Sequence, residues 1–318
     1  MMISQGKQLA TGQAPGKIIL FGEHAVVYGR PAIAVPVQQV QAHVVITPAE
    51  VCTIEAVDLG EAVDVTHAPA ENPFARMVRL VCAELSRPLP PWRIIIHSDI
   101  PIAAGLGSGA AISAAIARAM LAAWRVALPL NRLSALVYEV EKIHHGVPSG
   151  IDNTVVVYQR PVYFVKGQPP LPFSVTHPLH FLIADTGIAS PTKIVVGDVR
   201  RAWQAERERY ETLFDAIGDI AQKARIAIEM GDLPGLGALM TENQRLLAEL
   251  GVSSLGLERL VDAAMAAGAL GAKLSGGGRG GNIIALVSDG SLEQVRRALR
   301  EAGAARIIQT VVSPSLMV

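Results

Sequence analysis

The sequence is poor in the residues that mark several large classes of protein. It has only two cysteines, Cys52 and Cys82, which lie 30 positions apart, and only 4% of its residues are aromatic. Two cysteines at this spacing fit neither a disulfide framework nor a zinc site. Lys plus Arg and Asp plus Glu both total 28, so the formal net charge is zero. We therefore expect no nucleic acid and no membrane as partner, because no long-range field would draw the chain to either.

Hydrophobic residues are abundant, at 50% of 318, and only 18% of the residues are charged. A chain of this size and composition is expected to bury an extensive core, in two lobes or in one large domain. The longest apolar stretch, Gly109 to Trp124, is interrupted by Arg118 and predicts a buried helix rather than a membrane span. The first residues, MMISQGKQLATGQAPGK, lack the apolar segment of a signal peptide, and we expect a cytoplasmic protein.

Short runs of strand and helix character alternate in mixed blocks, which favours the α+β class over a regular βαβ repeat. Strands are predicted within 17–47, at 92–97, at 155–165, in the FLIADT segment after Pro178 and near 305–312. Helices are predicted at 73–85, after the glycine-rich segment 105–109, at 131–144 with Asn131 as the cap, around 191–229, at 233–249, at 256–267 and near 291–302. A boundary near 175 would separate an N-terminal domain, 1–175, from a C-terminal domain, 176–318.

The first motif, APGKIILFGEH at 14–24, is a predicted strand that brings Lys17, Glu23 and His24 into one neighbourhood. A cation, a carboxylate and an imidazole around a turn glycine can hold a polar substrate and neutralise a transferred charge. Ordinary charges at the end of a surface strand are the alternative.

The second motif, PIAAGLGSGAA at 101–111, is a glycine loop that leads directly into a helix. Exposed backbone N–H groups and the positive end of the helix dipole make an anion site, and the missing side chains let a polyphosphate approach. The motif is neither a Walker A sequence nor a dinucleotide fingerprint. A flexible turn is the alternative.

A third motif, KLSGGGRGGN at 273–282, has more glycines than a hairpin needs, so its backbone is expected to approach another group closely or to adopt positive φ. Between the second and third motifs, Glu141 and Asp152 lie 11 positions apart, one on a predicted helix and one after a Pro-Ser-Gly turn. These two carboxylates could converge on a metal-bound phosphate. Each taken alone is more typical of a solvated helix residue or a turn residue.

The three motifs, in this order and spacing, resemble the signature segments of the GHMP family of galacto-, homoserine, mevalonate and phosphomevalonate kinases. The resemblance extends from Ala14 to Asn282, and the segments APGKIILFGEHAVVYG and HGVPSGIDN are similar to those of the members that phosphorylate mevalonate. It implies a fold of two α+β lobes with the active site in the cleft between them. The implied reaction transfers the γ-phosphoryl group of ATP to a primary hydroxyl group, with Mg²⁺ as the metal and mevalonate as the substrate.

The resemblance also implies roles for individual residues. Asp152 matches the aspartate that accepts or orients the hydroxyl proton, Lys17 the lysine beside it, and Glu141 a Mg²⁺ ligand. Glu23, His24 and Thr192 match positions that line the mevalonate site. The positions that match the nucleotide loop are Pro101, Gly105, Leu106, Gly107, Ser108, Gly109 and Ala110.

Two positions depart from the family pattern. The phosphate loop is usually written GLGSSAA, and its second serine supplies a metal-ligating hydroxyl where this chain has Gly109. Ser108 or water must then be the ligand, and we favour Ser108 because its hydroxyl could also cap the helix. Arg279 stands where glycine is common, and could contact a phosphate or point into solvent.

Several rival functions are consistent with the sequence. Phosphomevalonate and homoserine are the closest alternative substrates within the family, and a decarboxylating relative is a more distant one. A non-catalytic metabolite sensor on the same fold is the alternative from another class. Retention of Lys17, Glu141 and Asp152 favours an enzyme. A homodimer is left open.

Overall fold

The computed structural model describes residues 8–101, 105–145, 148–190 and 192–314, in which helices combine with mixed and antiparallel sheets. The predicted α+β class is therefore confirmed. By internal contacts the chain divides into two compact units. Unit 1 comprises Met1–Gly16, Val40–Pro101 and Gly107–Gln159, and unit 2 comprises Lys17–Gln39, Ile102–Leu106 and Arg160–Val318. The long strands β1 (Ala10–Phe21) and β2 (Ala32–Pro48) contribute residues to both units.

The sheet of unit 1 is built on the second half of β2. This half pairs antiparallel with β5 (Trp92–Ser98), β5 pairs parallel with β3 (Thr53–Ala56), and β3 pairs antiparallel with β4 (Glu61–Asp64). A short 3₁₀ helix, Val57–Leu59, joins β3 to β4. Burial alternates along β5, where Trp92, Ile94 and Ile96 are buried. This period-2 pattern places one face of the sheet against the core.

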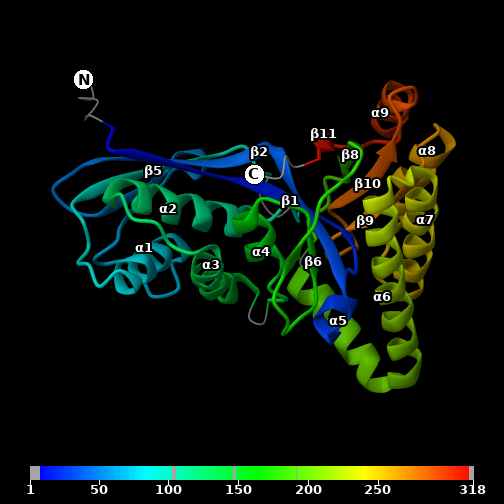
Figure 1. Cartoon of the computed structure of the whole chain (residues 1–318), viewed down its shortest axis with the longest axis horizontal. Coiled ribbons are helices and arrows are strands. Elements are labelled where there is room, and N and C mark those ends of the chain that lie inside the picture. The colour runs from blue at the N-terminus through cyan, green and yellow to red at the C-terminus, as the bar shows by residue number, and fades with distance from the viewer. Residues whose placement is uncertain (1–7, 102–104, 146–147, 191, 315–318) are drawn as a thin grey trace. The chain divides into compact units, whose positions relative to one another are not determined.

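Four helices complete unit 1: α1 (Pro73–Glu84), α2 (Ser108–Trp124), α3 (Leu130–His145) and α4 (Ile151–Tyr158). Figure 1 shows α1, α2 and α3 on one side of β2 and β5. The predicted apolar helix is α2, and its alanines pack in the core. Its one charged side chain, Arg118, donates to the carbonyl oxygens of Gln13 and Val157, each at 2.8 Å. These bonds tie α2 to β1 and α4, and burial lowers the pKa of this guanidinium.

Unit 2 contains an antiparallel sheet in the order β11-β8-β10-β9. Its strands are β8 (Leu179–Asp185), β9 (Gly271–Ser275), β10 (Asn282–Val287) and β11 (Arg306–Val312). The first half of β2 also lies in unit 2, where it pairs antiparallel with β6 (Val162–Phe164), which pairs with β7 (Leu171–Pro172). Because β9 is at the edge of its sheet, one row of its backbone groups is available to other segments.

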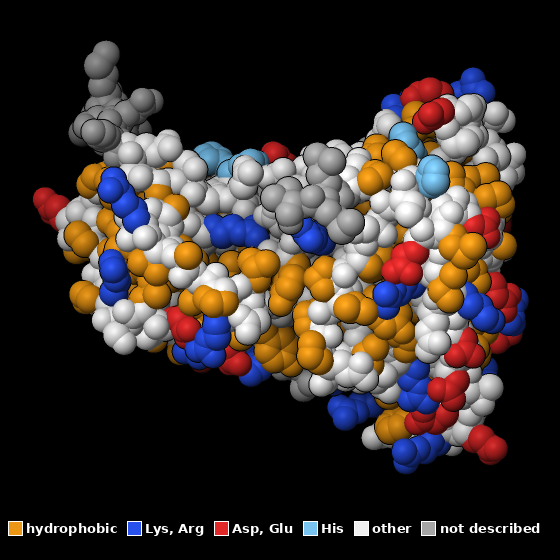
Figure 2. Space-filling view, in the orientation of Figure 1, with side chains coloured by type: hydrophobic (Ala, Val, Ile, Leu, Met, Phe, Trp, Pro, Cys, Tyr) orange, Lys and Arg blue, Asp and Glu red, His pale blue; other side chains and the backbone are white. Residues whose placement is uncertain are grey.

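The helices of unit 2 are α5 (Thr192–Ala205), α6 (Arg207–Met230), α7 (Leu233–Glu249), α8 (Leu255–Ala266) and α9 (Leu292–Glu301). Figure 1 shows α6, α7 and α8 beside the strands of this sheet, and α7 and α8 contact β9. Figure 2 shows acidic and basic side chains intermingled over this helical region. Ion pairs within single helices account for part of this pattern, as between Arg225 and Glu229 and between Arg245 and Glu242.

Three local predictions differ from the structure. Residues 155–158 were predicted as a strand but belong to α4, because the buried valines of this segment pack among the helices of unit 1, so tertiary contacts override their β propensity. Asn131 lies inside α3, which begins one residue earlier at Leu130, so it is not the cap. The residue at the start of α2 that has non-helical geometry is Gly107, and no side chain of a described residue caps this helix, so Ser108 is not a cap either.

Both cysteines are buried and free, and burial raises the pKa of Cys52 to about 12 and that of Cys82 to about 11. Their thiols are therefore protonated at neutral pH and unreactive. Within the four described ranges, no helix combines the length and the apolarity that crossing a membrane requires.

Candidate active site

The loop that follows β1 is fixed by close backbone packing. Gly22 has φ +91°, and a Cβ there would lie 2.5 Å from Cα of Ala32 and from the carbonyl oxygen of Pro31, so no other residue fits. A 3₁₀ helix, η1 (Ala25–Tyr28), follows, and the Tyr28 ring stacks on Phe214 of α6 with centroids 4.1 Å apart. Glu23 and His24 are thus held between two anchored points.

Glu23 is fully buried and forms an ion pair with Lys273 of β9, which is also fully buried. Burial raises the pKa of Glu23 and lowers the pKa of Lys273, while the attraction between the two charges opposes both changes. Lys17, itself only 4% exposed, adds a second positive charge that favours ionised Glu23. Only Oε1 of Glu23 contacts Lys273, and Oε2 is buried without a hydrogen-bond partner among the described residues.

His24 adjoins this ion pair and has a defined tautomer. Its Nε2 lies 3.0 Å from the carbonyl oxygen of Gly277, which can only accept, so the proton is on Nε2. Burial lowers the pKa of His24 to about 4, so the ring is neutral at pH 7. Its Nδ1 is therefore an acceptor, and within the described chain it has no partner. Glu23 and His24 together present two buried acceptor atoms without donors.

The glycine-rich loop after β9 passes close to the start of α5. A Cβ at Gly277 would lie 3.0 Å from Oγ1 of Thr192 and 3.1 Å from Oγ of Ser190, so Thr192 is adjacent to the residue that binds His24. Gly276, Gly278 and Gly281 all have positive φ, which confirms the expectation for this motif. Ser190 donates to the carbonyl oxygen of Gly278 at 2.6 Å and holds the loop on this side.

Arg279 has an exposed side chain that is also held by other residues of the chain. Its guanidinium pairs with Asp198 of α5 and donates to the carbonyl oxygen of Gly251 at 3.2 Å. Its backbone φ is +58°, and its N–H donates to the carbonyl oxygen of Val252 at 2.7 Å. Arg279 therefore fastens the glycine loop to α5 and to the turn after α7.

The second motif is divided between the two units. Gly105 and Leu106 belong to unit 2, where the Leu106 carbonyl oxygen accepts from the backbone N–H of Lys17 at 2.9 Å. Gly105 and Gly107 both have φ +74°. The residues from Gly107 to Ala110 belong to unit 1 and form the beginning of α2, with Ser108 as the first helical residue. Pro101 is half-buried, and 102–104 lie outside the described residues.

Unit 1 also carries the two predicted carboxylates on neighbouring helices. Glu141 is 2% exposed in the last turns of α3, and Asp152 is half-buried in the first turn of α4, where a carboxylate also interacts favourably with the helix dipole. Helix α2 contacts α3 and α4, and α3 contacts α4. The helix-borne part of the predicted site therefore lies on three helices of unit 1 that pack against one another.

The predicted site residues thus form two groups. The strand-end group in unit 2 contains Lys17, Glu23, His24 and Thr192. Gly105 and Leu106 belong to the same unit, and the backbone of Leu106 is hydrogen-bonded to that of Lys17. The helix group in unit 1 contains Gly107, Ser108, Gly109, Ala110, Glu141 and Asp152.

The donor chemistry of the helix group fits Mg²⁺. Glu141 offers carboxylate oxygens and Ser108 a hydroxyl oxygen, which are hard ligands of the type this ion prefers. In the part of the chain that the structure describes, no three His, Cys, Asp or Glu side chains gather as a metal cluster.

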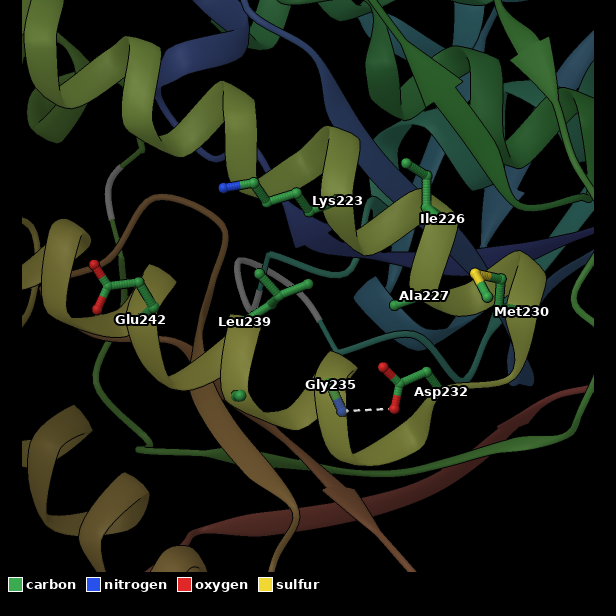
Figure 3. Close-up of a pocket in the computed structure, with 9 residues that line it drawn as sticks. Lys223, Ile226, Ala227, Met230, Asp232, Gly235, Leu239 and Glu242 are labelled. Carbon is green, nitrogen blue, oxygen red and sulfur yellow. Dashed lines mark hydrogen bonds between the residues drawn. The ribbon is translucent and has the colours of Figure 1, made fainter.

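A hollow between α6 and α7, of about 520 Å³, is separate from both groups (Figure 3). Its lining is mainly apolar, with Ile226, Met230 and Leu239, and its Asp232 caps α7 by accepting from the N–H of Gly235 at 2.9 Å. None of the predicted site residues lines it. Lys223, Asp232 and Glu242 also line it, but Asp232 is engaged in capping α7, and we do not assign the hollow to the active site.

The sequence did not indicate a role for Lys273 or Ser275. Both lie on one face of β9, and Ser275 accepts from the N–H of Ile19 at 3.2 Å while donating to its carbonyl oxygen at 2.8 Å. A single lysine inside the apolar strand GAKLS was an available signal, because a buried lysine requires a charged partner. The partner, 250 positions away, could not be read from the motif.

Comparisons with known protein families match both parts of the chain. Residues 72–160 match the family model described as GHMP kinases N terminal domain, and residues 223–305 match that described as GHMP kinases C terminal.

Relatives with known names extend the match to most of the chain. A protein of Pyrococcus horikoshii named mevalonate kinase is 34% identical over 96% of each chain, and one of Aeropyrum pernix with the same name is 35% identical over 91% of each. Among solved structures, L. major mevalonate kinase in complex with R-mevalonate superimposes with a TM-score of 0.85, at 28% identity over 100% of both chains.

Proposed function

The chain belongs to the GHMP kinase family, and from that premise we propose that it transfers the γ-phosphoryl group of ATP to the primary hydroxyl group of mevalonate. The observation that carries the proposal is the likeness, over nearly the whole length, to relatives named mevalonate kinase and to a structure that holds R-mevalonate. This reaction is a step in the biosynthesis of isoprenoid precursors.

The strand-end group supports this choice of substrate. Within the described ranges, Oε2 of Glu23 and Nδ1 of His24 are buried acceptors without donors, and such atoms cost about 1–3 kcal/mol each when left unsatisfied. A substrate with hydroxyl groups supplies the missing donors. Thr192 lies beside the Gly277 loop that holds His24, and its hydroxyl can donate or accept.

For phosphoryl transfer, the protein must orient the two reactants and neutralise the charge of the transferred group. The acceptor hydroxyl oxygen forms a bond to the γ-phosphorus, the bond from that phosphorus to the β–γ bridging oxygen breaks, and ADP leaves. Asp152 takes or orients the hydroxyl proton, and Lys17 stabilises the negative charge that develops on the transferred group. Both roles are proposals that rest on the family motif and on the two residues' burial.

The nucleotide is assigned to the glycine loop and the start of α2. The backbone N–H groups of Gly107, Ser108 and Gly109 are in the first turn of a helix that no side chain caps, and they can donate to phosphate oxygens. Glu141 and Ser108 would hold Mg²⁺. When bound, this ion would neutralise charge on the phosphates.

Three further features remain proposals. The family models match on either side of the predicted boundary near residue 175, which supports the N-terminal domain 1–175 and the C-terminal domain 176–318. A cytoplasmic location is proposed from the sequence.

The oligomeric state, which could be a homodimer, can be measured by analytical sedimentation.

The function is tested by ADP release with mevalonate, phosphomevalonate, homoserine and galactose, with the product identified by mass spectrometry. We expect mevalonate to give the highest kcat/KM. A higher value for another acceptor would reassign the substrate within the family. Binding of mevalonate and ATP without ADP release would instead identify a metabolite sensor.

A further inference from the structure

On one face of β9, Lys273 contacts the strand-end group and Ser275 contacts the strand that leads to it. These residues are two positions apart, so both side chains point to the same side of the strand. Ser275 forms two hydrogen bonds with the backbone of Ile19, and Lys273 pairs with Glu23 four residues later. One strand therefore sets both the path of the chain after Lys17 and the position of the carboxylate at its end.

The backbone of β9 is itself restrained. The N–H of Leu274 donates to Oε1 of Gln244 on α7 at 2.8 Å, and the amide of Gln244 donates to Oε1 of Glu258 on α8 at 2.9 Å. Gln244 is buried, and the chain of bonds satisfies an edge N–H that has no strand neighbour. Lys273 thus projects from a rigid position.

An ion pair at this depth is an unusual choice for stability alone. Removing two charges from water costs about as much as their attraction returns, and apolar replacements of buried pairs are often neutral. The pair does, however, fix geometry. The ammonium of Lys273 donates to Oε1 of Glu23 and to the carbonyl oxygen of Leu274 at 2.5 Å, so the carboxylate cannot rotate freely.

The consequence falls on the other oxygen. With Oε1 engaged, Oε2 is the atom left without a donor among the described residues, and Nδ1 of the next residue, His24, also has none there. We propose that Lys273 is a positioning residue that holds the Glu23 carboxylate so that Oε2 accepts a hydrogen bond from a hydroxyl group of the substrate. This inference rests on the proposed function and adds to it a residue that the family motif does not explain.

The test is Lys273→Met, which keeps an unbranched side chain shorter by one atom and removes its charge. A positioning role predicts that KM for mevalonate and its dissociation constant, measured by calorimetry without nucleotide, rise by roughly 10- to 100-fold, as for loss of a charge-assisted hydrogen bond. We expect kcat to change less than KM, and the affinity for a non-hydrolysable ATP analogue to stay within about twofold. Lys223→Met, an exposed lysine on α6, is the matched control.

A purely structural lysine would behave differently. If the role of Lys273 were purely structural, Lys273→Met would lower the melting temperature and would weaken the binding of mevalonate and of the ATP analogue equally. That result would overturn the inference. Because Lys273→Met leaves a buried charge unpaired and the single variant can fail to fold, Glu23→Gln and the double variant Glu23→Gln/Lys273→Met complete a cycle. If Lys273 acts through Glu23, the double variant binds mevalonate as Glu23→Gln does. Additive losses would overturn the inference.

The same data separate this inference from the function. A wild-type enzyme that phosphorylates mevalonate, with a Lys273→Met variant of unchanged KM, would overturn the role of Lys273 and leave the function intact. A wild-type enzyme inert toward mevalonate would overturn both.

Discussion

The two groups of site residues are held in place by different means. In the helix group, Ser108 opens α2, Glu141 lies in α3 and Asp152 is in the first turn of α4, so local backbone geometry places each side chain. In the strand-end group, Glu23 and His24 lie in a loop and are held by Lys273 and Gly277, about 250 positions later. Residues of one motif can therefore depend on another motif for their charge state and orientation.

The largest expected effect is in the helix group. Asp152→Asn should lower kcat by roughly 10²- to 10⁴-fold, because Asp152 takes or orients the proton of the acceptor hydroxyl. Binding of an ATP analogue should be nearly intact. Steady-state kinetics and calorimetry measure the two, with the exposed Asp219→Asn as control. A variant that keeps more than about a tenth of the wild-type rate would remove Asp152 from this role.

Glu141→Gln tests whether Glu141 binds the metal ion rather than the substrate. We expect a higher Mg²⁺ requirement and a smaller change in the affinity for mevalonate, because the proposed partner of Glu141 is the metal at the phosphates. Titration of MgCl₂ at fixed ATP tests this. Glu139→Gln, on the same helix but paired with Lys142, is the control. An unchanged Mg²⁺ optimum would favour a structural role for Glu141.

The strand-end group should respond to pH through His24. In the unfolded chain this residue takes up a proton near its ordinary pKa of 6.5, but in the folded protein its pKa is about 4. Its contribution to stability is therefore complete above pH 6.5 and is lost as the pH falls toward 4. The expected loss at pH 5 is about 2 kcal/mol of unfolding free energy.

Denaturant unfolding at pH 7 and pH 5 measures this effect. The loss of stability between the two pH values should be smaller in His24→Asn than in the wild type. Equal losses in the wild type and in His24→Asn would show that His24 is not the group responsible.

The last test concerns the departure from the family at Gly109, where Ser108 and water are alternative metal ligands. If Ser108 is the metal ligand, Ser108→Ala should cost about 1.5–3 kcal/mol of transition-state stabilisation, and Gly109→Ser should gain little. If water fills the position, Ser108→Ala is mild and Gly109→Ser lowers the Mg²⁺ requirement. Values of kcat/KM across a Mg²⁺ series separate the two. Wild-type kinetics for Ser108→Ala at limiting Mg²⁺ would leave the loop with its backbone N–H groups alone.

Much of the fold could be predicted from periodicity and turn residues. The stripe of α1, the alternation of β5 and the apolar α2 follow from local sequence. Residues 155–158 did not, because a run of buried valines has the same pattern in a strand and in a short core helix. Arg279 was also beyond local inference, since its partner Asp198 belongs to another helix.

The sequence by itself determined the family, the reaction class and which residue types stand in the three motifs, because these depend on order and spacing along the chain. Tertiary structure alone decided that Lys273 neutralises Glu23, that Gly277 fixes the tautomer of His24 and that Oε2 and Nδ1 are the acceptors left over. The reason is physical. Burial makes each charge and each polar atom depend on the one partner within hydrogen-bond reach, and that partner is chosen by folding rather than by proximity in sequence.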